Sequence, residues 1–383
     1  MIVTDARASG ASSRSHRQRT TLVLAATLMA ISGACSAAGD ASMTRTPGLT
    51  GDKTISIDAD PAQLSDPVIV RIGVFPNVTH APGLLALAED GPIRALLPNA
   101  DIQVNAFNSG TTAVEAMFAD AIDLTFVGPN PAINAYVKSH GEAVRVISGS
   151  TSGGAFLVVR DGIATAEDLQ GMTVASPSLG NTQDVALRTW LAGHGLGTNT
   201  AGGGDVHVVP QENAQTLETF VAGTIDGAWV PEPWATRLIR EGGAHVLVDE
   251  RDLWPGGRYV TTQLMVATQY LEAHPDVVSR ILLAVIQSVD IANDGPADAQ
   301  AGVDREIERY TGKSLGPELL AAAWSNLSFT VDPVATSLER SAQDAAALDL
   351  LEDPGDLSGL YDLRLLNEIL TAMGRATVEG LEQ

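Results

Sequence analysis

Four loops of this chain carry the kinds of residue that bind a small anion. Each follows an apolar run, and all but the third precede a segment with helical periodicity: Phe75–Pro82, Asn108–Thr111, Thr151–Gly154 and Ser178–Asp184. The first N–H groups of a helix are unpaired and carry a partial positive charge, so they bind an anion without needing Arg or Lys. The glycines of the third loop would let backbone amides approach a ligand closely. Ordinary helix capping explains any one of these loops, whereas the set of four favours anion binding.

The rest of the chain offers little that could catalyse a reaction. Its 7 histidines are scattered without a pair at metal-ligand spacing, and its single cysteine, Cys35, stands in the N-terminal segment. There is no G-x-S-x-G sequence and no Walker loop. His140, His194 and His274 fall at the ends of predicted helices, where capping or solvent contact explains them. We therefore expect a binding protein that is not an enzyme and that uses no metal and no cofactor.

The sequence of one predicted helix-strand unit occurs twice in the chain, which indicates two similar lobes. Val114–Val127 and Leu217–Val230 share residues in register: Glu115/Glu218, Ala119/Ala222, Ile122/Ile225, Asp123/Asp226 and Val127/Val230. Each copy is predicted as a helix, a turn at the Ile-Asp step, an apolar strand and a loop with two prolines. Ligands of α/β proteins bind where such loops leave the carboxyl ends of strands. Unless the likeness arose by chance, two lobes face each other across a cleft.

Short apolar runs alternate with amphipathic segments from Val68 to Ala267, which predicts parallel sheets with helices on both faces. From Gln269 to Met373 the pattern is almost wholly helical, and we expect these helices to pack on the first lobe. The chain would then cross between lobes near Gly154–Arg160 and near Arg258–Val266. The predicted divisions are a signal peptide (1–34), a tether (35–67), the first part of lobe 1 (68–155), lobe 2 (156–262), and the return to lobe 1 with the C-terminal helices (263–383).

Length and charge restrict the possible partners. A chain of 383 residues is long enough for two lobes, each with its own core. Residues 1–34 hold four of the 23 basic and one of the 46 acidic residues, so the remainder has 19 and 45 and a formal charge of −26. Such a negative surface argues against nucleic acid and anionic membranes as partners. An anionic ligand must therefore be held by local groups.

The N-terminal segment has the order of a bacterial lipoprotein signal. A basic stretch from Arg14 to Arg19 precedes the apolar run Thr21–Ile31, which is too short to span a bilayer as a stable helix. Small residues, Ser32-Gly33-Ala34, then lead to Cys35. We expect lipidation of Cys35 and a flexible tether after it. A simple secretory signal with an incidental cysteine is the alternative.

Several motifs in one order give the chain a strong resemblance to a known family. After the first strand they read P-N-V-T-H-A-P, G-T-T-A-V-E-A-M, I-D-L-T-F-V-G-P-N-P, T-S-G-G-A, L-G-N-T-Q-D, E-N-A-Q-T-L and D-G-A-W-V-P-E-P-W. Over about residues 68–370 the chain resembles the extracytoplasmic solute-binding proteins of ABC transporters, in particular the aliphatic sulfonate, nitrate and taurine group. The resemblance implies an α/β, bilobal type II periplasmic-binding-protein fold: two doubly wound lobes joined by two hinge crossings, with the helical C-terminal region packed on lobe 1.

The resemblance also implies a ligand site between the lobes. Its residues would be Asn77, Thr79, His80, Ser109, Gly110, Gly128, Pro129, Asn130, Ser152, Gly153, Gly154, Asn181, Thr182, Gln183, Asn213, Glu232 and Trp234. Glu232 would repel a purely anionic ligand, so it either faces away from the cleft or meets a cationic or hydrogen-bond-donating group. Trp229 and Trp234 are interpreted as core packing or as an apolar wall for the ligand.

The implied function is delivery of a small organic anion to an ABC permease and its ATPase. The protein would be a monomer on the outer face of the cell membrane, held there by its lipid anchor alone. An aliphatic sulfonate is the leading ligand, while nitrate, taurine and a thiamin pyrimidine precursor stay open. Two other classes are considered: an enzyme like the pyrimidine-forming enzymes of thiamin synthesis, whose cysteine-rich motif this chain lacks, and a ligand-sensing module for a membrane receptor.

Overall fold

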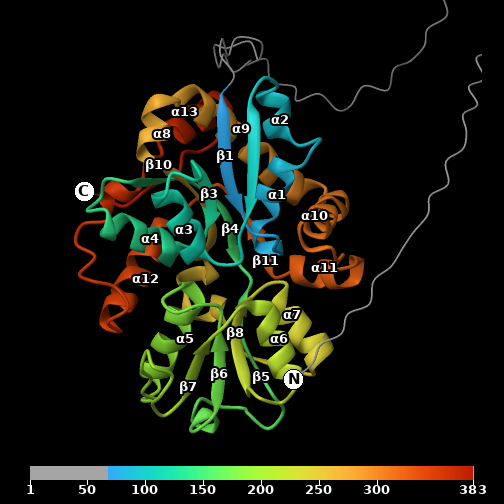
Figure 1. Cartoon of the computed structure of the whole chain (residues 1–383), viewed down its shortest axis with the longest axis vertical. Helices are drawn as coiled ribbons and strands as arrows, with labels where there is room; N and C mark the ends of the chain where they lie inside the picture. The colour runs from blue at the N-terminus through green and yellow to red at the C-terminus, as the bar shows by residue number, and fades with distance from the viewer. Residues whose placement is uncertain (1–67, 383) are drawn as a thin grey trace, which may run out of the picture. The chain divides into compact units, whose positions relative to one another are not determined.

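The computed structural model describes residues 68–382, and all of them belong to one compact unit, Lys53–Gln383. The predicted signal peptide, Cys35 and the whole predicted tether lie outside the described residues. Two sheets organise the unit, with the second drawn below the first in Figure 1.

The first sheet has six strands in the order β11-β4-β10-β3-β1-β2. Their bounds are β1 Ile69–Val74, β2 Asp101–Ala106, β3 Leu124–Val127, β4 Val144–Gly153, β10 Val260–Ala267 and β11 Leu327–Phe329. The second sheet has five strands in the order β7-β6-β8-β5-β9. Their bounds are β5 Ala155–Val159, β6 Thr173–Ser176, β7 His207–Pro210, β8 Gly227–Pro231 and β9 His245–Asp249.

Both sheets are mixed, which corrects the expectation of purely parallel sheets. The strands β1, β2 and β3 are parallel, as are β6, β7 and β8, but β10 runs antiparallel to β3 and β5 runs antiparallel to β8. The reason is the route of the chain. The strands β5 and β10 each begin where the chain has just crossed from the other sheet, so each runs in the direction opposite to its parallel-paired neighbours. The short strand β11 is also antiparallel to its neighbour, β4.

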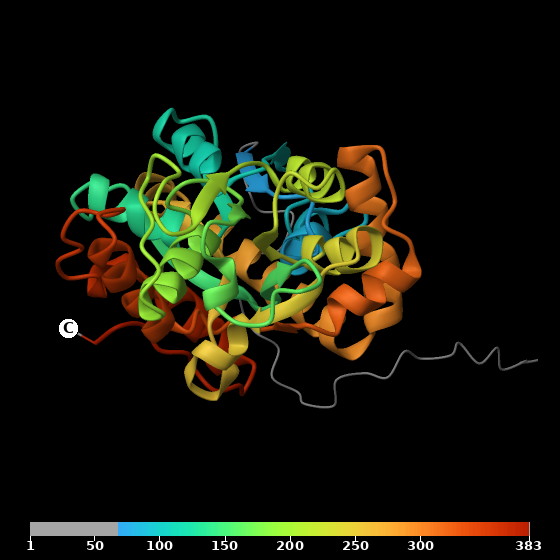
Figure 2. The same ribbon diagram turned by 90° about the horizontal axis from the view of Figure 1, so that it is seen from below.

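Helices cover both faces of each sheet, as the alternating pattern predicts. One core of the first sheet includes residues of α1 (Ala81–Leu87), α2 (Pro92–Leu96), α8 (Thr268–Ala273), α9 (Pro275–Asp294), α10 (Pro296–Thr311), α11 (Pro317–Trp324) and α13 (Arg364–Ala372). Its other core includes residues of α3 (Gly110–Phe118), α4 (Pro129–Lys138) and α12 (Ala335–Ala347). Figures 1 and 2 both place α10 and α11 on the side away from α12. The C-terminal helices therefore pack on the first sheet, as expected.

The second sheet lies between α5 (Thr182–Gly193) on one face and α6 (Asn213–Val221) with α7 (Trp234–Gly242) on the other. Short 3-10 turns complete the chain at Val78–His80, Glu167–Leu169, Glu250–Leu253, Pro255–Gly257 and Ser358–Leu360. Pro92 begins α2 just after α1, and Pro275 begins α9 just after α8, because proline lacks an N–H group and is suited to the first position of a helix. The short strand β11 was not predicted.

The duplicated unit is α3–β3 in the first lobe and α6–β8 in the second. In each copy the repeated aspartate fastens the new strand to the neighbouring parallel strand of its sheet, β1 for β3 and β6 for β8. The Asp123 amide donates to Arg71 O and its carboxylate accepts from Arg71 N, both at 2.8 Å. Asp226 forms the same pair with Thr173, at 2.8 and 2.9 Å. The repeated Ile-Asp step thus has a structural role, because it fixes the register from which the cleft-facing loop departs.

The chain passes between the sheets at two neighbouring places. The first is at Gly153 and Gly154, whose φ angles of 80° and 75° lie in the left-handed region that favours glycine. The second follows Gly257 and ends where β10 begins, so the predicted boundary after residue 262 falls inside this strand. The crossings are joined by hydrogen bonds, since the Ala155 amide donates to Tyr259 Oη at 3.2 Å and Thr261 Oγ1 donates to Gly153 O at 2.6 Å.

Candidate binding site

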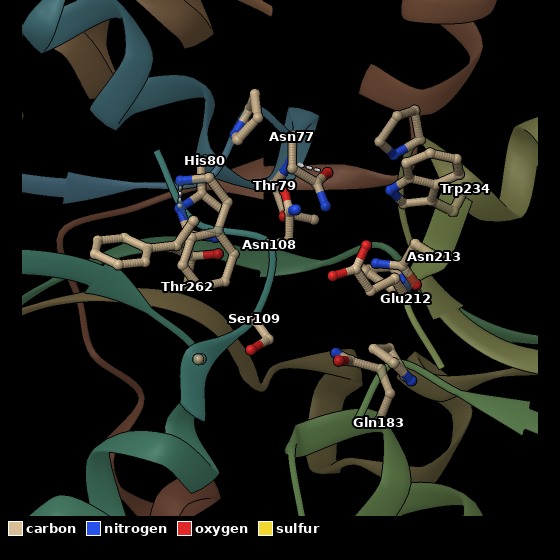
Figure 3. Close-up of a pocket in the computed structure, with 18 of the residues that line it drawn as sticks. Asn77, Thr79, His80, Asn108, Ser109, Gln183, Glu212, Asn213, Trp234 and Thr262 are labelled. Carbon is tan, nitrogen blue, oxygen red and sulfur yellow. Dashed lines mark hydrogen bonds between the residues drawn. The ribbon is translucent and has the colours of Figure 1, made fainter. Parts of the chain in front are cut away.

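A cavity of about 340 Å³ lies where the two sheets face each other. The first sheet contributes the loops after β1, β2 and β3 and the start of β10, and the second sheet contributes the loops after β6, β7 and β8. Figure 3 shows the labelled side chains around one common space, with Asn77, His80 and Ser109 from the first sheet and Gln183, Asn213 and Trp234 from the second. The volume lies in the range of sites for small organic ligands.

Four helices, α3, α5, α6 and α7, begin at this cavity, and the N-cap side chains of α3 and α5 accept hydrogen bonds from the first turn of their helix. Ser109 Oγ accepts from the Thr112 amide at 3.4 Å, and Asn181 Oδ1 accepts from the Asp184 amide at 3.0 Å. The Asn181 side chain caps α5, so the hydroxyl of Thr182, the first residue of this helix, is not needed as the cap. Within the described residues Thr182 Oγ1 has no hydrogen-bond partner, so it is available to a ligand.

The loop after β1 presents a neutral histidine. His80 is 3% exposed, and burial lowers its pKa to about 3. Its ring stacks on Phe75 with centroids 4.3 Å apart, and its Nδ1 accepts from the Phe75 amide at 3.4 Å. The proton of the neutral ring is therefore on Nε2, for which the described residues offer no acceptor. His80 can donate one hydrogen bond to a ligand but brings no positive charge.

Two further polar groups at the cavity lack partners among residues 68–382. Thr262 is 0% exposed and its Oγ1 makes no hydrogen bond. Asn213 Oδ1 is also buried without a donor. Buried polar atoms are nearly always paired, so these two indicate places for ligand or water atoms.

The charges that line the cavity are mixed. Glu212, from the loop after β7, and Lys313, from the segment between α10 and α11, are exposed there. Arg237 also lines the cavity, but its guanidinium is bound by Glu241 at 2.7 and 3.1 Å and lies 4.9 Å from the ring centre of Trp234. The site thus has no excess of free positive charge.

Most of the predicted site residues come together at this cavity. They are Asn77, Thr79, His80, Ser109, Gly110, Gly128, Asn181, Thr182, Gln183, Asn213 and Trp234. Trp234 belongs to the wall, whereas Trp229 is fully buried in the core and its Nε1 donates to Glu250 at 2.7 Å.

Six predicted site residues do not line the cavity. Three of them, Ser152, Gly153 and Gly154, stand at the end of β4, where the unpredicted strand β11 covers them. Leu327 pairs with Gly153 and Ser328 pairs with Ser152, so the end of β4 lies between β11 and β10 and does not form an open amide cage.

The other three face elsewhere for separate reasons. Pro129 begins α4, and Asn130 turns toward α12, where its Nδ2 donates to Ser341 O at 3.3 Å. Glu232 is 1% exposed, and its carboxylate accepts from Thr236 N at 3.2 Å, Thr236 Oγ1 at 2.8 Å and Asn326 Nδ2 at 2.7 Å. Burial raises the pKa of Glu232 above its ordinary value, and these three hydrogen bonds offset only part of that increase. Of the two orientations considered for Glu232, the structure has the one that faces away from the ligand.

Sequence reasoning missed a group of cavity residues. They are Phe75, Pro76, Phe107, Asn108, Pro131, Pro177, Glu212, Ala214, Pro231, Pro233, Arg237, Thr261, Thr262, Ile307, Thr311, Lys313 and Leu315. Phe75, Pro76 and Asn108 belong to the predicted loops Phe75–Pro82 and Asn108–Thr111 but were not among the predicted site residues, and Glu212 stands directly before the predicted Asn213. Lys313 follows α10 far along the chain, and no local pattern marks it.

Within residues 68–382, no helix combines the length and the apolar character needed to cross a bilayer. The same part of the chain holds no group of three or more His, Cys, Asp or Glu side chains placed to bind a metal ion.

The chain matches the model of the NMT1-like family over residues 64–304. A Brucella abortus protein described as a binding protein is 24% identical over 273 residues, which cover 67% of this chain and 80% of that protein. The bicarbonate transport ATP-binding protein CmpC of Synechocystis sp. is 29% identical over 136 residues, which cover 33% of this chain and only 20% of CmpC.

Two solved structures show the same fold at low sequence identity. The alkanesulfonate-binding protein SsuA from Xanthomonas axonopodis pv. citri, bound to MOPS, aligns with a TM-score of 0.62 at 19% identity over 76% of this chain and 96% of SsuA. The periplasmic nitrate-binding protein NrtA from Synechocystis PCC 6803 aligns with a TM-score of 0.65 at 13% identity over 80% of this chain and 89% of NrtA. The chain therefore belongs to the NMT1-like family and has the two-lobed fold of the extracytoplasmic solute-binding proteins of ABC importers.

Proposed function

We propose that this protein captures a small organic solute between its two lobes and delivers it to the permease of an ABC importer. The observation that carries the proposal is the cavity of about 340 Å³, which is lined by strand-end loops of both sheets. A solute bound there contacts both lobes at once, so it favours the arrangement in which they face each other closely. The family membership supports this role, and the crossings at Gly153–Gly154 and after Gly257 are the proposed hinge.

The proposed solute is a small organic anion, with an aliphatic sulfonate as the first candidate. Free amides at the starts of α3 and α5 and the hydroxyl of Thr182 can hold charged oxygens. Apolar walls from Phe75, Phe107 and Trp234 suit an alkyl or ring portion. Nitrate has no such portion, so it would leave these walls uncovered. Taurine and a pyrimidine precursor stay as alternatives.

Thermal-shift screening and titration calorimetry of the purified protein with alkanesulfonates, nitrate, taurine and pyrimidines test the proposal. We expect one class to bind and to lower the radius of gyration in small-angle scattering. If none binds at millimolar concentration, the proposed solute class is wrong. Mass spectrometry of each incubated solute separates binding from catalysis, because a converted solute would favour the enzyme alternative.

We also propose that Cys35, outside the described residues, carries a lipid anchor on the outer face of the cell membrane. Cys35→Ala should release the protein from the membrane fraction. A variant that stays membrane-bound contradicts the anchor but leaves the proposed solute binding intact.

A further inference from the structure

The cavity contains one carboxylate that the protein does not use. Glu212 stands immediately before α6, and only its backbone oxygen is occupied there, by the amide and hydroxyl of Thr216 at 2.9 and 3.1 Å. Within residues 68–382 its side chain has no ion pair and no hydrogen bond. In Figure 3 the Glu212 carboxylate projects into the space between Asn77 and Gln183. It is therefore placed to meet whatever enters the cavity.

None of the positive groups at the cavity neutralises this carboxylate. The guanidinium of Arg237 is bound by Glu241, and His80 is a buried neutral ring. Lys313 is the remaining basic group of the lining and makes no ion pair among the described residues. It comes from the first lobe, whereas Glu212 comes from the second. The cavity thus offers one free negative and one free positive group on different lobes.

A second acceptor stands beside the carboxylate. Asn213 follows Glu212 directly, and its Oδ1 is buried without a donor. Two adjacent acceptors at the start of α6 call for a group that donates several hydrogen bonds. An ammonium or amidinium nitrogen satisfies both, whereas a sulfonate oxygen or a nitrate ion satisfies neither. A solute with negative charge alone would also bring a like charge close to Glu212 in a site from which closure removes water.

We propose that the solute of this protein is zwitterionic: a cationic nitrogen binds Glu212 and Asn213, and an acidic group at the other end of the molecule binds the starts of α3 and α5. This inference rests on the proposed solute-binding function and specifies the chemical class of the solute. A simple alkanesulfonate or nitrate would fill only part of this arrangement.

Matched pairs of small molecules test the inference, because replacing a terminal ammonium by a methyl group changes charge and hydrogen bonding at nearly constant size. The pairs are taurine with propane-1-sulfonate, β-alanine with butyrate, and 2-aminoethylphosphonate with propylphosphonate. In titration calorimetry we expect the ammonium member of at least one pair to bind roughly ten- to a hundred-fold more tightly, as for a hydrogen bond to a charged group.

The variant Glu212→Gln should remove this preference by weakening the ammonium member while leaving the methyl member unchanged or tighter. Glu218→Gln is the matched control, since Glu218 is exposed on the same helix but does not line the cavity. The control should keep the preference, and both variants should unfold at the same urea concentration as the wild type.

The possible failures separate the two proposals. If methyl members bind as well as ammonium members, or if Glu212→Gln keeps the preference, the zwitterion inference is overturned while solute binding stands. If no member of any pair binds, and no solute of the wider screen binds either, both proposals are overturned. If only solutes without a cationic nitrogen bind, the inference fails alone.

Discussion

Removing the hydroxyl of Thr182 should weaken solute binding without weakening the fold. Thr182 is 7% exposed, lines the cavity, and its Oγ1 has no partner among the described residues. The cap of α5 is supplied by Asn181 Oδ1, which accepts from the Asp184 amide at 3.0 Å. Thr182→Val keeps the shape of the side chain and replaces only the hydroxyl, by a methyl group.

The expected size of the effect follows from this geometry. A hydrogen bond to a charged oxygen contributes about 1.5–3 kcal/mol, so Thr182→Val should weaken binding roughly ten- to a hundred-fold. Losing a helix cap usually costs about 1 kcal/mol. Because the Asn181 cap is retained, the free energy of unfolding should change by less than that. Thr182→Ser keeps the hydroxyl and should bind with an affinity near that of the wild type.

Titration calorimetry with the tightest solute of the screen, combined with urea unfolding, measures both quantities. If Thr182→Val binds as the wild type does, the hydroxyl does not contact the solute and the anion-binding role of this loop is wrong. Lost stability with unchanged affinity would instead show that Thr182 supports the helix.

Three further predictions follow from burial and close approach. A Cβ on Gly128 would lie 2.8 Å from Thr182 Oγ1 across the cleft, so Gly128→Ala should hinder closure and weaken binding, and Thr182→Ala should then weaken binding less in this variant than in the wild type; an unchanged titration would contradict this. Burial lowers the pKa of His80 to about 3, so below pH 6.5 the unfolded state binds a proton that the folded state excludes. Through this group the free energy of unfolding should fall by about 1.4 kcal/mol for each pH unit between pH 6.5 and about pH 3. In urea unfolding, His80→Gln should remove that part of the slope and the exposed His207→Gln should not. Burial raises the pKa of Glu250 to about 7, so its ionisation should lower the free energy of unfolding as the pH rises from 4.5 through 7. The stabilisation by Glu250→Gln should therefore be greater at pH 8 than at pH 4.5, by on the order of 3 kcal/mol. Equal stabilisation at both pH values would refute the buried-charge explanation.

Much of the fold could be predicted from the sequence because it depends on local patterns. The duplicated unit became α3–β3 and α6–β8, and the family and the two-lobed fold were confirmed. Capping residues such as Ser109 and Asn181 marked where helices begin, because a cap and the amide it accepts from are only three residues apart. Loops at strand ends were therefore identified as the place for a ligand, and 11 of the 17 predicted site residues line the cavity.

Long-range pairing decided the rest. The strand β11 pairs with the end of β4, so Ser152 and Gly153 are held within the sheet and do not face a ligand. Glu232 turns toward Asn326, a residue far along the chain, and this leaves Glu212 as the free carboxylate of the cavity. Which acidic group faces a ligand depends on which residues the return segment of the chain contacts. Local sequence periodicity does not predict long-range contacts such as that between Glu232 and Asn326. The sequence by itself determined most of the helices and strands and most of the loops that face the cleft, whereas the tertiary structure alone decided which side chains those loops leave unpaired.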